Sequence, residues 1–229
     1  MTTELKNKIL YSNLITELIL TNNVLAIYLG GSRFYNLDSS ESDYDIIVIS
    51  KGNSLLNYNK TKLILNDKDI KIHIAIQPIN SLLDLIKSPN NKGAFKINKG
   101  LIELLMGLDN KLIYSTQKFT SLHNILIKYN KELTYLALSN CIQNLKGRIT
   151  LPVKGYNKIY YHYLVMYFLF KNFKELNTLV LTTKQKEIIT KFKYTKIIPM
   201  ELYSALDLTI NTLYCYDYSK IYKEVKVYE

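Results

Sequence analysis

Two short motifs constrain this chain more than any other part of its sequence. An apolar run over residues 24–29 enters the turn Gly30-Gly31-Ser32-Arg33, and Asp43-Tyr44-Asp45 then opens a second apolar run that ends near residue 50. The carboxylates of a strand's residues i and i+2 point to the same face. Two such anions repel each other unless a cation lies between them, and Mg²⁺ prefers hard oxygen ligands. The pattern therefore predicts a phosphate-approaching turn beside an acidic, metal-holding pair.

The hydrophobic pattern predicts strands in the first third of the chain and helices in the rest. Strands are expected over residues 24–29, 44–50 and 69–77, and in the last of these isoleucines alternate with polar residues until Pro78. Helices are expected over residues 5–20, 81–87, 101–108, 158–173, 184–193 and 199–214, and residues 121–145 are expected to form one long helix or two. The predicted fold is α+β, with a small mixed β-sheet domain at residues 1–115 and a helical domain at residues 116–229.

The positive charge of the chain is unevenly distributed. The formal net charge is +11, and residues 116–229 carry 17 Lys and Arg against 8 Asp and Glu, whereas residues 1–115 carry 13 against 11. A basic helical half predicts a polyanionic partner, most simply a nucleic acid. The alternative is that these lysines form solvated helix faces, since a sequence rich in Lys, Asn, Ile and Tyr is typical of AT-rich coding DNA, as in phages.

Neither a membrane span nor a signal peptide is predicted. No apolar stretch reaches the roughly 20 residues that cross a bilayer, and the N-terminus has no apolar segment of the kind that signal peptides contain. Cys141 and Cys215 are not spaced like metal ligands and are expected to be thiols of a reducing compartment. We therefore expect a cytoplasmic protein, in the host cytoplasm if a phage encodes it.

The two motifs together provide most of the groups that a nucleotidyl transfer needs. Glycines at 30 and 31 let backbone N–H groups approach a triphosphate, Ser32 offers a hydroxyl donor and Arg33 a positive charge. Asp43 and Asp45 are the expected metal ligands. For a third carboxylate we choose Asp69, because it opens a strand as Asp43 does. His73, a poor ligand for Mg²⁺, and Asp67, in a turn, are the alternatives, and Asp69 also reads as an edge residue that discourages aggregation.

The segments Leu29–Arg33 and Ser42–Ile46 resemble the signature of the DNA polymerase beta superfamily of nucleotidyltransferases. More narrowly, Arg33, Tyr35 and Leu37 are similar to the pattern G-S-R-x-Y-x-L of predicted bacterial and phage nucleotidyltransferases linked to RNA repair. Residues 98–105 resemble that branch's N-P-x-x-x-E-x-L helix, with Lys99 in place of the proline. Residues 154–162 resemble its K-x-Y-x-K-x-x-x-H segment, although the arginine expected soon after His162 is absent.

The resemblance implies a metal-dependent transfer of a nucleoside monophosphate from a nucleoside triphosphate to an acceptor hydroxyl. It implies Mg²⁺, with Mn²⁺ as the alternative, and catalytic, metal-holding roles for Asp43 and Asp45. The family's third-carboxylate region is poorly matched in this chain, so the catalytic role of Asp69 is our choice from the strand pattern. Gly31, Ser32 and Arg33 would contact the nucleotide, together with Lys158 and His162, which lie one turn apart on a helix. The charge asymmetry favours an RNA acceptor, for example the 3′ end of tRNA.

Other interpretations of the sequence remain open. The first alternative is the same nucleotidyl transfer to another acceptor, either a protein side chain or a small molecule such as an aminoglycoside. A second alternative is a non-catalytic nucleic-acid-binding module, and a third is a structural or interaction protein. Taken without the resemblance, Glu103 is expected to be a solvated helix residue, and the tyrosines between residues 156 and 167 are expected to pack between helices.

Overall fold

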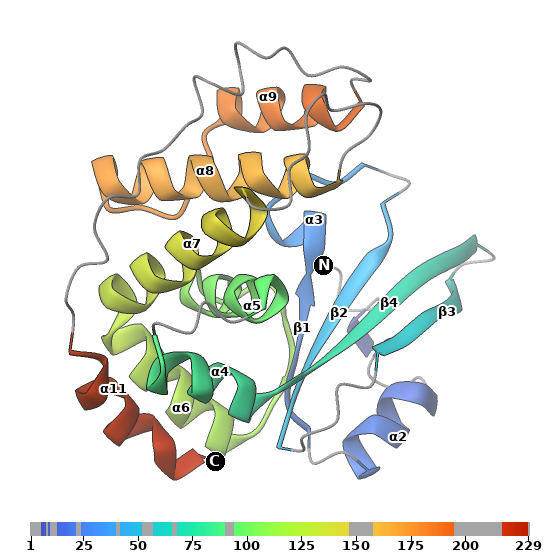
Figure 1. Cartoon of the computed structure of the whole chain (residues 1–229). Helices are drawn as coiled ribbons and strands as arrows, with labels where there is room; N and C mark the ends of the chain where they lie inside the picture. Colours follow the sequence, from blue (N-terminus) through green and yellow to red (C-terminus); the bar gives the residue numbers. More distant parts are fainter. Residues whose placement is uncertain are drawn as a thin grey trace. The chain divides into compact units, whose positions relative to one another are not determined.

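The fold is α+β, as predicted, and the sheet is mixed. The computed structural model describes residues 6–7, 9, 13–21, 24–39, 42–51, 57–65, 68–89, 94–146, 158–194 and 217–228. The chain divides into two compact units (Figure 1). Unit 1 contains Met1–Ser88, Glu103–Asn130 and Tyr218–Glu229, and unit 2 contains Pro89–Ile102 and Lys131–Asp217. The predicted domain boundary at residue 115 stays a prediction, and it falls inside the second segment of unit 1.

A five-stranded sheet forms the centre of unit 1 within the described residues. Its strands are β1 (Val24–Gly30), β2 (Tyr44–Ser50), β3 (Asn57–Leu65), β4 (Lys68–Pro78) and β5 (Leu112–Ser115). They lie in the order β3-β4-β2-β1-β5. Strand β2 pairs antiparallel with β1 and parallel with β4, and the two outer pairs are antiparallel. The end of β1 and the start of β2, where the two motifs lie, are therefore adjacent in the middle of the sheet.

Alternation along the strands gives the sheet one continuous apolar face. Ile27 and Leu29 of β1 lie with Ile46 and Val48 of β2, and each is at most 4% exposed. The isoleucines at 72, 74 and 76 of β4 extend this face, as the alternation in the sequence predicts. Residues of odd number on β2 and β4, including Asp45 and His73, belong to the other face of the sheet.

Several helical segments accompany the sheet in the described part of unit 1. They are α2 (Asn13–Thr21), α3 (Gly31–Phe34), α4 (Ile79–Lys87), α6 (Gln117–Lys128), α11 (Tyr218–Val225) and the 3₁₀ helix η1 (Lys226–Tyr228). Helix α2 contacts β1, α6 contacts β1 and α4 contacts β4, while α11 packs against both α4 and α6 (Figure 1). Helix α5 (Phe95–Leu105) begins in unit 2 and ends in unit 1.

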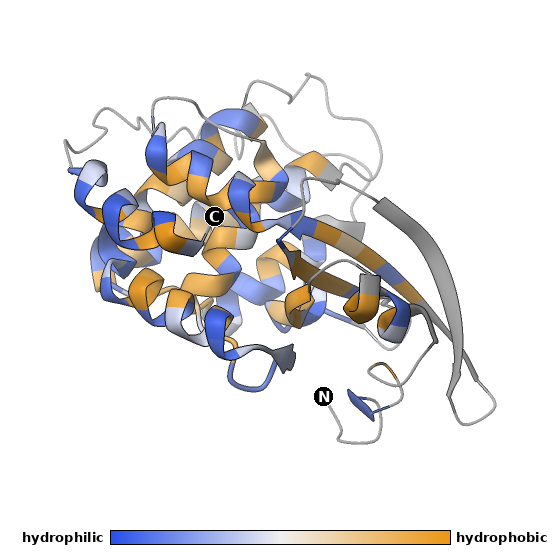
Figure 2. Cartoon of the chain, turned by 90° about the horizontal axis from the view of Figure 1, so that it is seen from below, coloured by the Kyte–Doolittle hydropathy of each residue, from blue (hydrophilic) through white to orange (hydrophobic). Residues whose placement is uncertain are grey.

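Unit 2 is helical in its described part. It contains most of α7 (Asn130–Lys146), together with α8 (Lys158–Leu176) and α9 (Thr183–Tyr194). Figure 2 shows hydrophilic and hydrophobic residues interspersed along the described helices of the chain. Tyr160 and Tyr163, two of the tyrosines between residues 156 and 167, are 1% exposed and so pack between helices, as predicted. Cys141 is a buried free thiol, also as predicted, and Cys215 lies outside the described residues.

Several predicted helix and strand boundaries differ from the structure. The segment 121–145, expected to form one long helix or two, lies in two helices, because α6 ends at Lys128 and α7 begins at Asn130. Strands β3 and β5 and helix α11 were not predicted from the sequence. The helix expected over 199–214 lies outside the described residues. None of the described helices is both long and apolar enough to cross a membrane.

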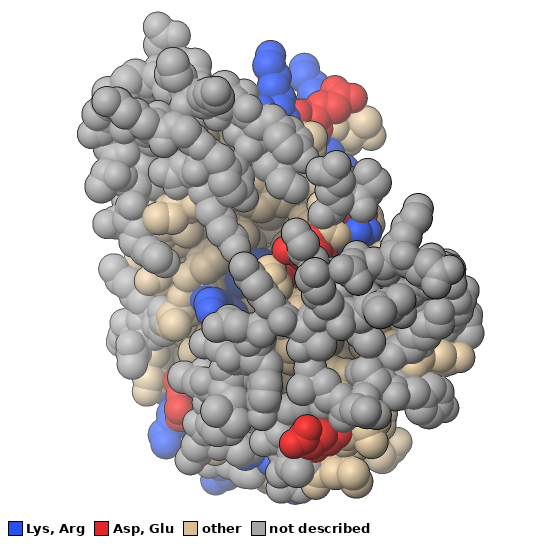
Figure 3. Space-filling model, turned by 90° about the vertical axis from the view of Figure 1, so that its right-hand side faces the viewer, with Lys and Arg blue, Asp and Glu red and all other residues tan. Residues whose placement is uncertain are grey.

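Charged side chains are dispersed over the face of the molecule in Figure 3. The described Lys and Arg side chains (blue) and the described Asp and Glu side chains (red) form separate small groups on it.

Candidate functional site

The glycine turn is formed where buried strand β1 meets the short helix α3. All seven residues of β1 are buried, and Gly31 opens α3 with φ +67°, a left-handed conformation that favours glycine. The turn then closes on itself, since the Leu37 N–H donates to the Ser32 carbonyl at 2.9 Å. Phe34 and Tyr35 are both 5% exposed, so apolar burial holds the turn against the sheet.

Sheet pairing brings the turn directly against the acidic pair. Gly30 is the antiparallel partner of Asp45. A Cβ atom on Gly31 would lie 1.8 Å from Oδ2 of Asp45 and 2.6 Å from its Cγ, so the carboxylate fills the space that a side chain would need. A Cβ atom on Gly30 would lie 2.7 Å from the Ile47 side chain. The glycine turn and Asp45 are thus packed directly against each other.

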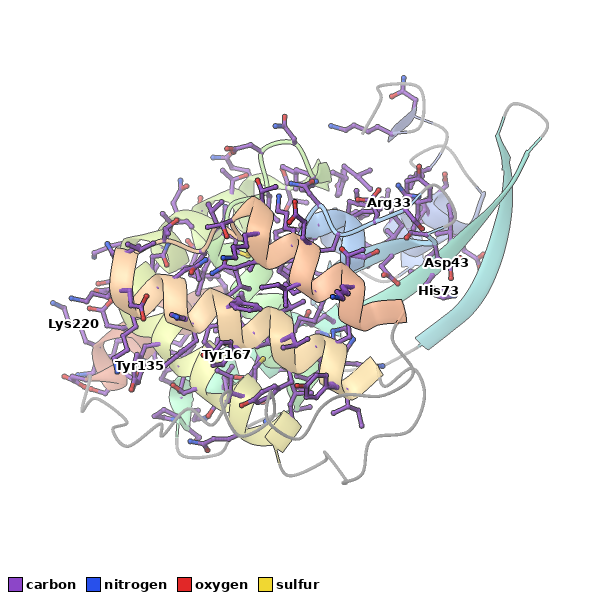
Figure 4. All side chains as sticks on the ribbon, turned by 90° about the horizontal axis from the view of Figure 1, so that it is seen from above. Arg33, Asp43, His73, Tyr135, Tyr167 and Lys220 are labelled. Atoms are coloured by element: carbon purple, nitrogen blue, oxygen red, sulfur yellow. The ribbon has the colours of Figure 1, made fainter. Side chains whose placement is uncertain are left out.

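The two carboxylates share a third neighbour, His73 of β4. Nε2 of His73 lies 3.5 Å from Oδ2 of Asp43, and Nδ1 lies 3.5 Å from Oδ1 of Asp45. Asp43 and Asp45 are 34% and 40% exposed, and His73 is 36% exposed, so all three are reachable from solvent. Figure 4 shows Asp43 and His73 close together beside β4. The parallel register explains the contact, because Asp45 and His73 are directly paired.

Asp69, the chosen third carboxylate, does not lie opposite the acidic pair. The first residue of β4 that pairs with β2 is Ile72, opposite Tyr44, whereas Asp69 pairs with Ile64 of β3. The choice of Asp69 rests on its opening a strand as Asp43 does, but the first residues of the two strands do not meet. The first four residues of β4, Lys68–Lys71, extend past the start of β2 and pair with β3 instead. Asp69 is four residues, roughly 13 Å, before His73 along the strand. Its side chain lies outside the described residues, and its catalytic role stays a prediction.

Arg33 is engaged by the protein itself. Its Nη1 donates to Oδ2 of Asp38 at 2.8 Å, and its Nη2 donates to the carbonyl of Ser42 at 2.6 Å. Its guanidinium carbon lies 3.9 Å from the centre of the Tyr44 ring. The predicted contact of Arg33 with a nucleotide stays a prediction, while these contacts with the segment before the acidic pair are observed.

A buried polar pair lies behind the glycine turn. The Tyr28 hydroxyl donates to Oε2 of Glu103 at 3.4 Å, and both residues are at most 1% exposed. Burial, and then the nearby Glu103 carboxylate, raise the pKa of Tyr28 well above its usual value. The same Oε2 would lie 3.4 Å from a Cβ on Gly30. The expectation of a solvated Glu103 is wrong, because α5 turns this residue into the interior of unit 1.

Lys158 and His162 both belong to α8 in unit 2. Lys158 is the first residue of that helix, and its side chain lies outside the described residues. His162 is half-buried, and its ring centre lies 5.3 Å from that of Phe95. Their proposed contact with a nucleotide therefore stays a prediction. His123 is structural: its Nε2 lies 2.8 Å from the Leu104 carbonyl, and its ring stacks on Phe119.

The acidic pair fits a metal that arrives with a ligand rather than a complete protein cage. In the described part of the chain, no three His, Cys, Asp or Glu side chains are grouped so that they hold a metal ion by themselves. Mg²⁺ is commonly bound by one or two carboxylates plus the phosphates of a substrate. Asp43 and Asp45 supply two such carboxylates, and the missing Cβ of Gly31 leaves backbone close to them.

A shallow hollow in the described surface does not include this site. It has a volume of about 210 Å³ and is lined by Phe34, residues 106–107 and residues 109–111. Lys111, on its rim, donates to the carbonyl of Arg33 at 3.0 Å. We place the candidate site at the acidic pair, because the charged groups converge there and the hollow has no comparable cluster.

Comparisons with known proteins add little to this geometry. No protein-family model matches the chain, and no curated protein matches it in sequence. Among solved structures, it is similar to a nucleotidyltransferase-like protein from Exiguobacterium sibiricum, with 12% identity and a TM-score of 0.35 over 99% of this chain and 72% of that one. A likeness at this level carries no argument, so the function must be inferred from the site.

Proposed function

We propose that this chain is a nucleotidyltransferase whose active site is the junction of the glycine turn with Asp43 and Asp45. In the proposed reaction, an acceptor hydroxyl attacks the α-phosphorus of a nucleoside triphosphate. The hydroxyl loses its proton, its oxygen bonds to the phosphorus, and the bond to the pyrophosphate oxygen breaks. The products are the nucleotidylated acceptor and pyrophosphate.

The observation that carries this proposal is the contact between Gly31 and Asp45. Position 31 requires a glycine, because its φ is positive and any side chain there would occupy the place of Oδ2 of Asp45. The turn and the Asp45 carboxylate therefore depend on each other. A turn with accessible backbone suits phosphate groups, and a half-exposed carboxylate pair suits their metal ion. The sequence predicted that these two features lie together.

The roles of the residues follow from their positions. Asp43 and Asp45 would hold a divalent metal, Mg²⁺ or Mn²⁺, which when bound neutralises charge that develops on the phosphoryl groups. Gly31 and Ser32 would orient the triphosphate through backbone N–H and hydroxyl donors. His73 contacts both carboxylates and so fixes their orientation relative to each other.

RNA is the proposed acceptor, and the 3′ end of tRNA is its most specific form. The support is the charge of residues 116–229, where Lys and Arg outnumber Asp and Glu by 17 to 8. Phosphate contacts make binding fall steeply with salt. A gel shift with tRNA at low and moderate salt tests this part independently. A protein or small-molecule acceptor would leave the shift absent while label still transfers to that acceptor.

The central test is transfer of label from radiolabelled nucleoside triphosphates to a tRNA pool with Mg²⁺. We expect Asp45→Ala to lower the rate about a thousandfold, because a metal site supplies several kcal/mol of transition-state stabilisation and each 1.4 kcal/mol is tenfold. Asp84→Asn is the matched control, since Asp84 is an exposed carboxylate on α4 away from the site.

The outcomes separate the alternatives. Label transfer that survives Asp45→Ala at the rate of the Asp84→Asn control refutes the assigned metal role. Wild-type protein that binds tRNA but transfers no label to RNA, protein or small molecules supports the non-catalytic binding module.

A further inference from the structure

Arg33 connects the glycine turn to the residues that carry the acidic pair. It lies two residues after Gly31, and its guanidinium reaches forward across the loop to Asp38 and to the carbonyl of Ser42. Ser42 is the residue immediately before Asp43. Hydrogen bonds from a charged donor are among the stronger ones in proteins, and the 2.6 Å bond to Ser42 is short. Arg33 thus holds the backbone at the point where the acidic pair begins.

The same guanidinium also fixes the residue between the two aspartates. Its carbon lies 3.9 Å from the centre of the Tyr44 ring, well inside the distance of a cation–π contact. Tyr44 packs against the apolar face of the sheet. Because side chains alternate along a strand, Tyr44 and the two carboxylates leave the backbone on opposite sides. Holding Tyr44 therefore sets the direction in which Asp43 and Asp45 project on the other side.

The base of Arg33 is anchored as well as its tip. Lys111 donates to the Arg33 carbonyl at 3.0 Å and to Oδ1 of Asn36 at 3.3 Å. The Arg33 side chain is only 16% exposed, and its Nε atom is buried without a hydrogen-bond partner among the described residues. Figure 4 shows Arg33 and Asp43 in the same part of unit 1. Little of the guanidinium is left to meet a phosphate group.

We infer that Arg33 is a positioning residue that fixes Asp43 and Asp45 relative to the glycine turn, and that it does not bind the triphosphate. The catalytic consequence of this inference rests on the proposed function, whereas the structural consequence does not. The tests therefore have two readouts, one kinetic and one spectroscopic.

The spectroscopic readout is the imidazole resonance of His73, which contacts both carboxylates. The chain has three histidines, and the His73 signal is the one that His73→Gln removes from the NMR spectrum. We expect Arg33→Ala, Asp38→Ala and Tyr44→Leu each to shift this signal, and Tyr44→Phe, which keeps the ring, to shift it less. The His123 signal should stay in place, because its contacts with Leu104 and Phe119 lie elsewhere in unit 1.

Lys87→Ala is the matched control for loss of a cation–π contact. Lys87 of α4 lies 5.4 Å from the centre of the Tyr222 ring of α11, and neither residue belongs to the candidate site. It should leave the His73 signal unchanged. If Arg33→Ala leaves His73 unshifted while His123 is also unshifted, the positioning role is overturned, whether or not the protein transfers nucleotides.

The kinetic readout separates positioning from nucleotide binding. Loss of a group that orients metal ligands commonly costs tenfold to a hundredfold in activity, so we expect Arg33→Ala to lower kcat by about that factor. KM for the nucleoside triphosphate should stay within about threefold. The Arg33→Ala/Asp38→Ala double variant should be no slower than Arg33→Ala alone, because Asp38 acts through Arg33.

The opposite pattern refutes the inference. If Arg33→Ala raises KM tenfold or more and keeps kcat, Arg33 contacts the nucleotide. A wild-type protein without transfer activity contradicts the proposed function alone, and the His73 shifts then decide the role of Arg33.

Discussion

Two polar networks in this protein differ in charge and in exposure. The network of unit 1 joins His73 to Asp43 and Asp45, and the carboxylates are 34% and 40% exposed. Arg33 binds the segment next to this network, at the Ser42 carbonyl. The network of unit 2 joins α8 to α9 through neutral amides, and its central residue, Asn172, is 3% exposed. Charged groups that stay open to solvent are suited to bind something from solvent, whereas a closed neutral network serves stability.

The unit 2 network satisfies its members reciprocally. Asn172 donates to Oε1 of Gln185 at 2.8 Å and to the carbonyl of Val180 at 2.7 Å, and Gln185 returns a bond to Oδ1 of Asn172 at 2.7 Å. Thr182 closes the cluster by donating its N–H to Gln185. The acidic pair has no such closure among the described residues, and its side chains are partly open to solvent. Substitutions should therefore affect activity in one network and stability in the other.

The largest effect that distinguishes the networks is expected from Gly31→Ala. The new Cβ would clash with the Asp45 carboxylate at a backbone φ that disfavours alanine. We expect label transfer to fall about a hundredfold or more, since a displacement of 1 Å at a reacting centre can cost that much. Gly107→Ala is the matched control, because Gly107 also has a positive φ (+91°) but nothing lies within 4 Å of its Cβ position. Equal label transfer by Gly31→Ala and Gly107→Ala would contradict the placement of the active site at the contact between Gly31 and Asp45.

The reverse effect is expected in unit 2. Asn172→Leu leaves the Gln185 amide without its partner, which should lower the free energy of unfolding by about 1–3 kcal/mol, the cost of a buried unsatisfied group. Transfer by the folded protein should stay at the wild-type rate. Urea unfolding measures the first quantity, and initial rates far below the transition measure the second. The double variant Asn172→Leu/Gln185→Leu should cost less than the sum of the single changes.

A smaller effect should appear when the site is made more acidic. His73→Asp places a third carboxylate beside Asp43 and Asp45, and like charges about 4 Å apart repel by about 1 kcal/mol in water. We expect the free energy of unfolding to fall by that order in EDTA and to recover with Mg²⁺. His73→Asn, which is uncharged, should show no such recovery. If Mg²⁺ stabilises both variants equally, the open, charged character of the site is in doubt.

The smallest effect concerns a third cluster, at α11 in unit 1. The Tyr129 hydroxyl and then the Lys128 ammonium lower the pKa of Glu224 below its usual value. A lowered carboxyl pKa contributes stability above the unfolded-state pKa, near 4.5, and that stability is lost as the pH falls through the folded-state value. The protection factors of the α11 amides, which are exchange rates corrected for the intrinsic pH dependence of exchange, should therefore fall between pH 6 and pH 3. Glu224→Gln should flatten this pH dependence. If the pH dependence persists in Glu224→Gln, another titratable group causes it.

The centre of the sheet could be predicted because its strands are long and regular. Unbroken apolar residues indicate β1 and β2, and alternating isoleucines indicate β4. Strand β5 has only four residues, too few for a period, and β3 mixes polar and apolar residues. The helical pattern over 121–145 is compatible with one helix or two, and nothing in it locates the break, which lies at Tyr129 between α6 and α7.

The site was predictable where it depends on neighbouring strands and unpredictable where it depends on register or tertiary burial. Adjacent antiparallel strands place Asp45 beside Gly31, as the spacing of the motifs indicates. The choice of Asp69 depended on where β4 begins to pair with β2, which is set by its hairpin with β3. The burial of Glu103 against Tyr28 has no local signal, since the two residues are 75 positions apart.

The strand order β3-β4-β2-β1-β5 has a consequence for how the chain reaches its native state. The β3–β4 hairpin closes over a few residues, from Leu65 to Lys68. Strands β2 and β4 are neighbours in the sheet and pair in parallel, although the whole of β3 lies between them in the sequence. Local pairings assemble faster than distant ones. We expect the imidazole of His73 to reach the two aspartates only when the finished hairpin docks, so that the acidic centre matures late during folding.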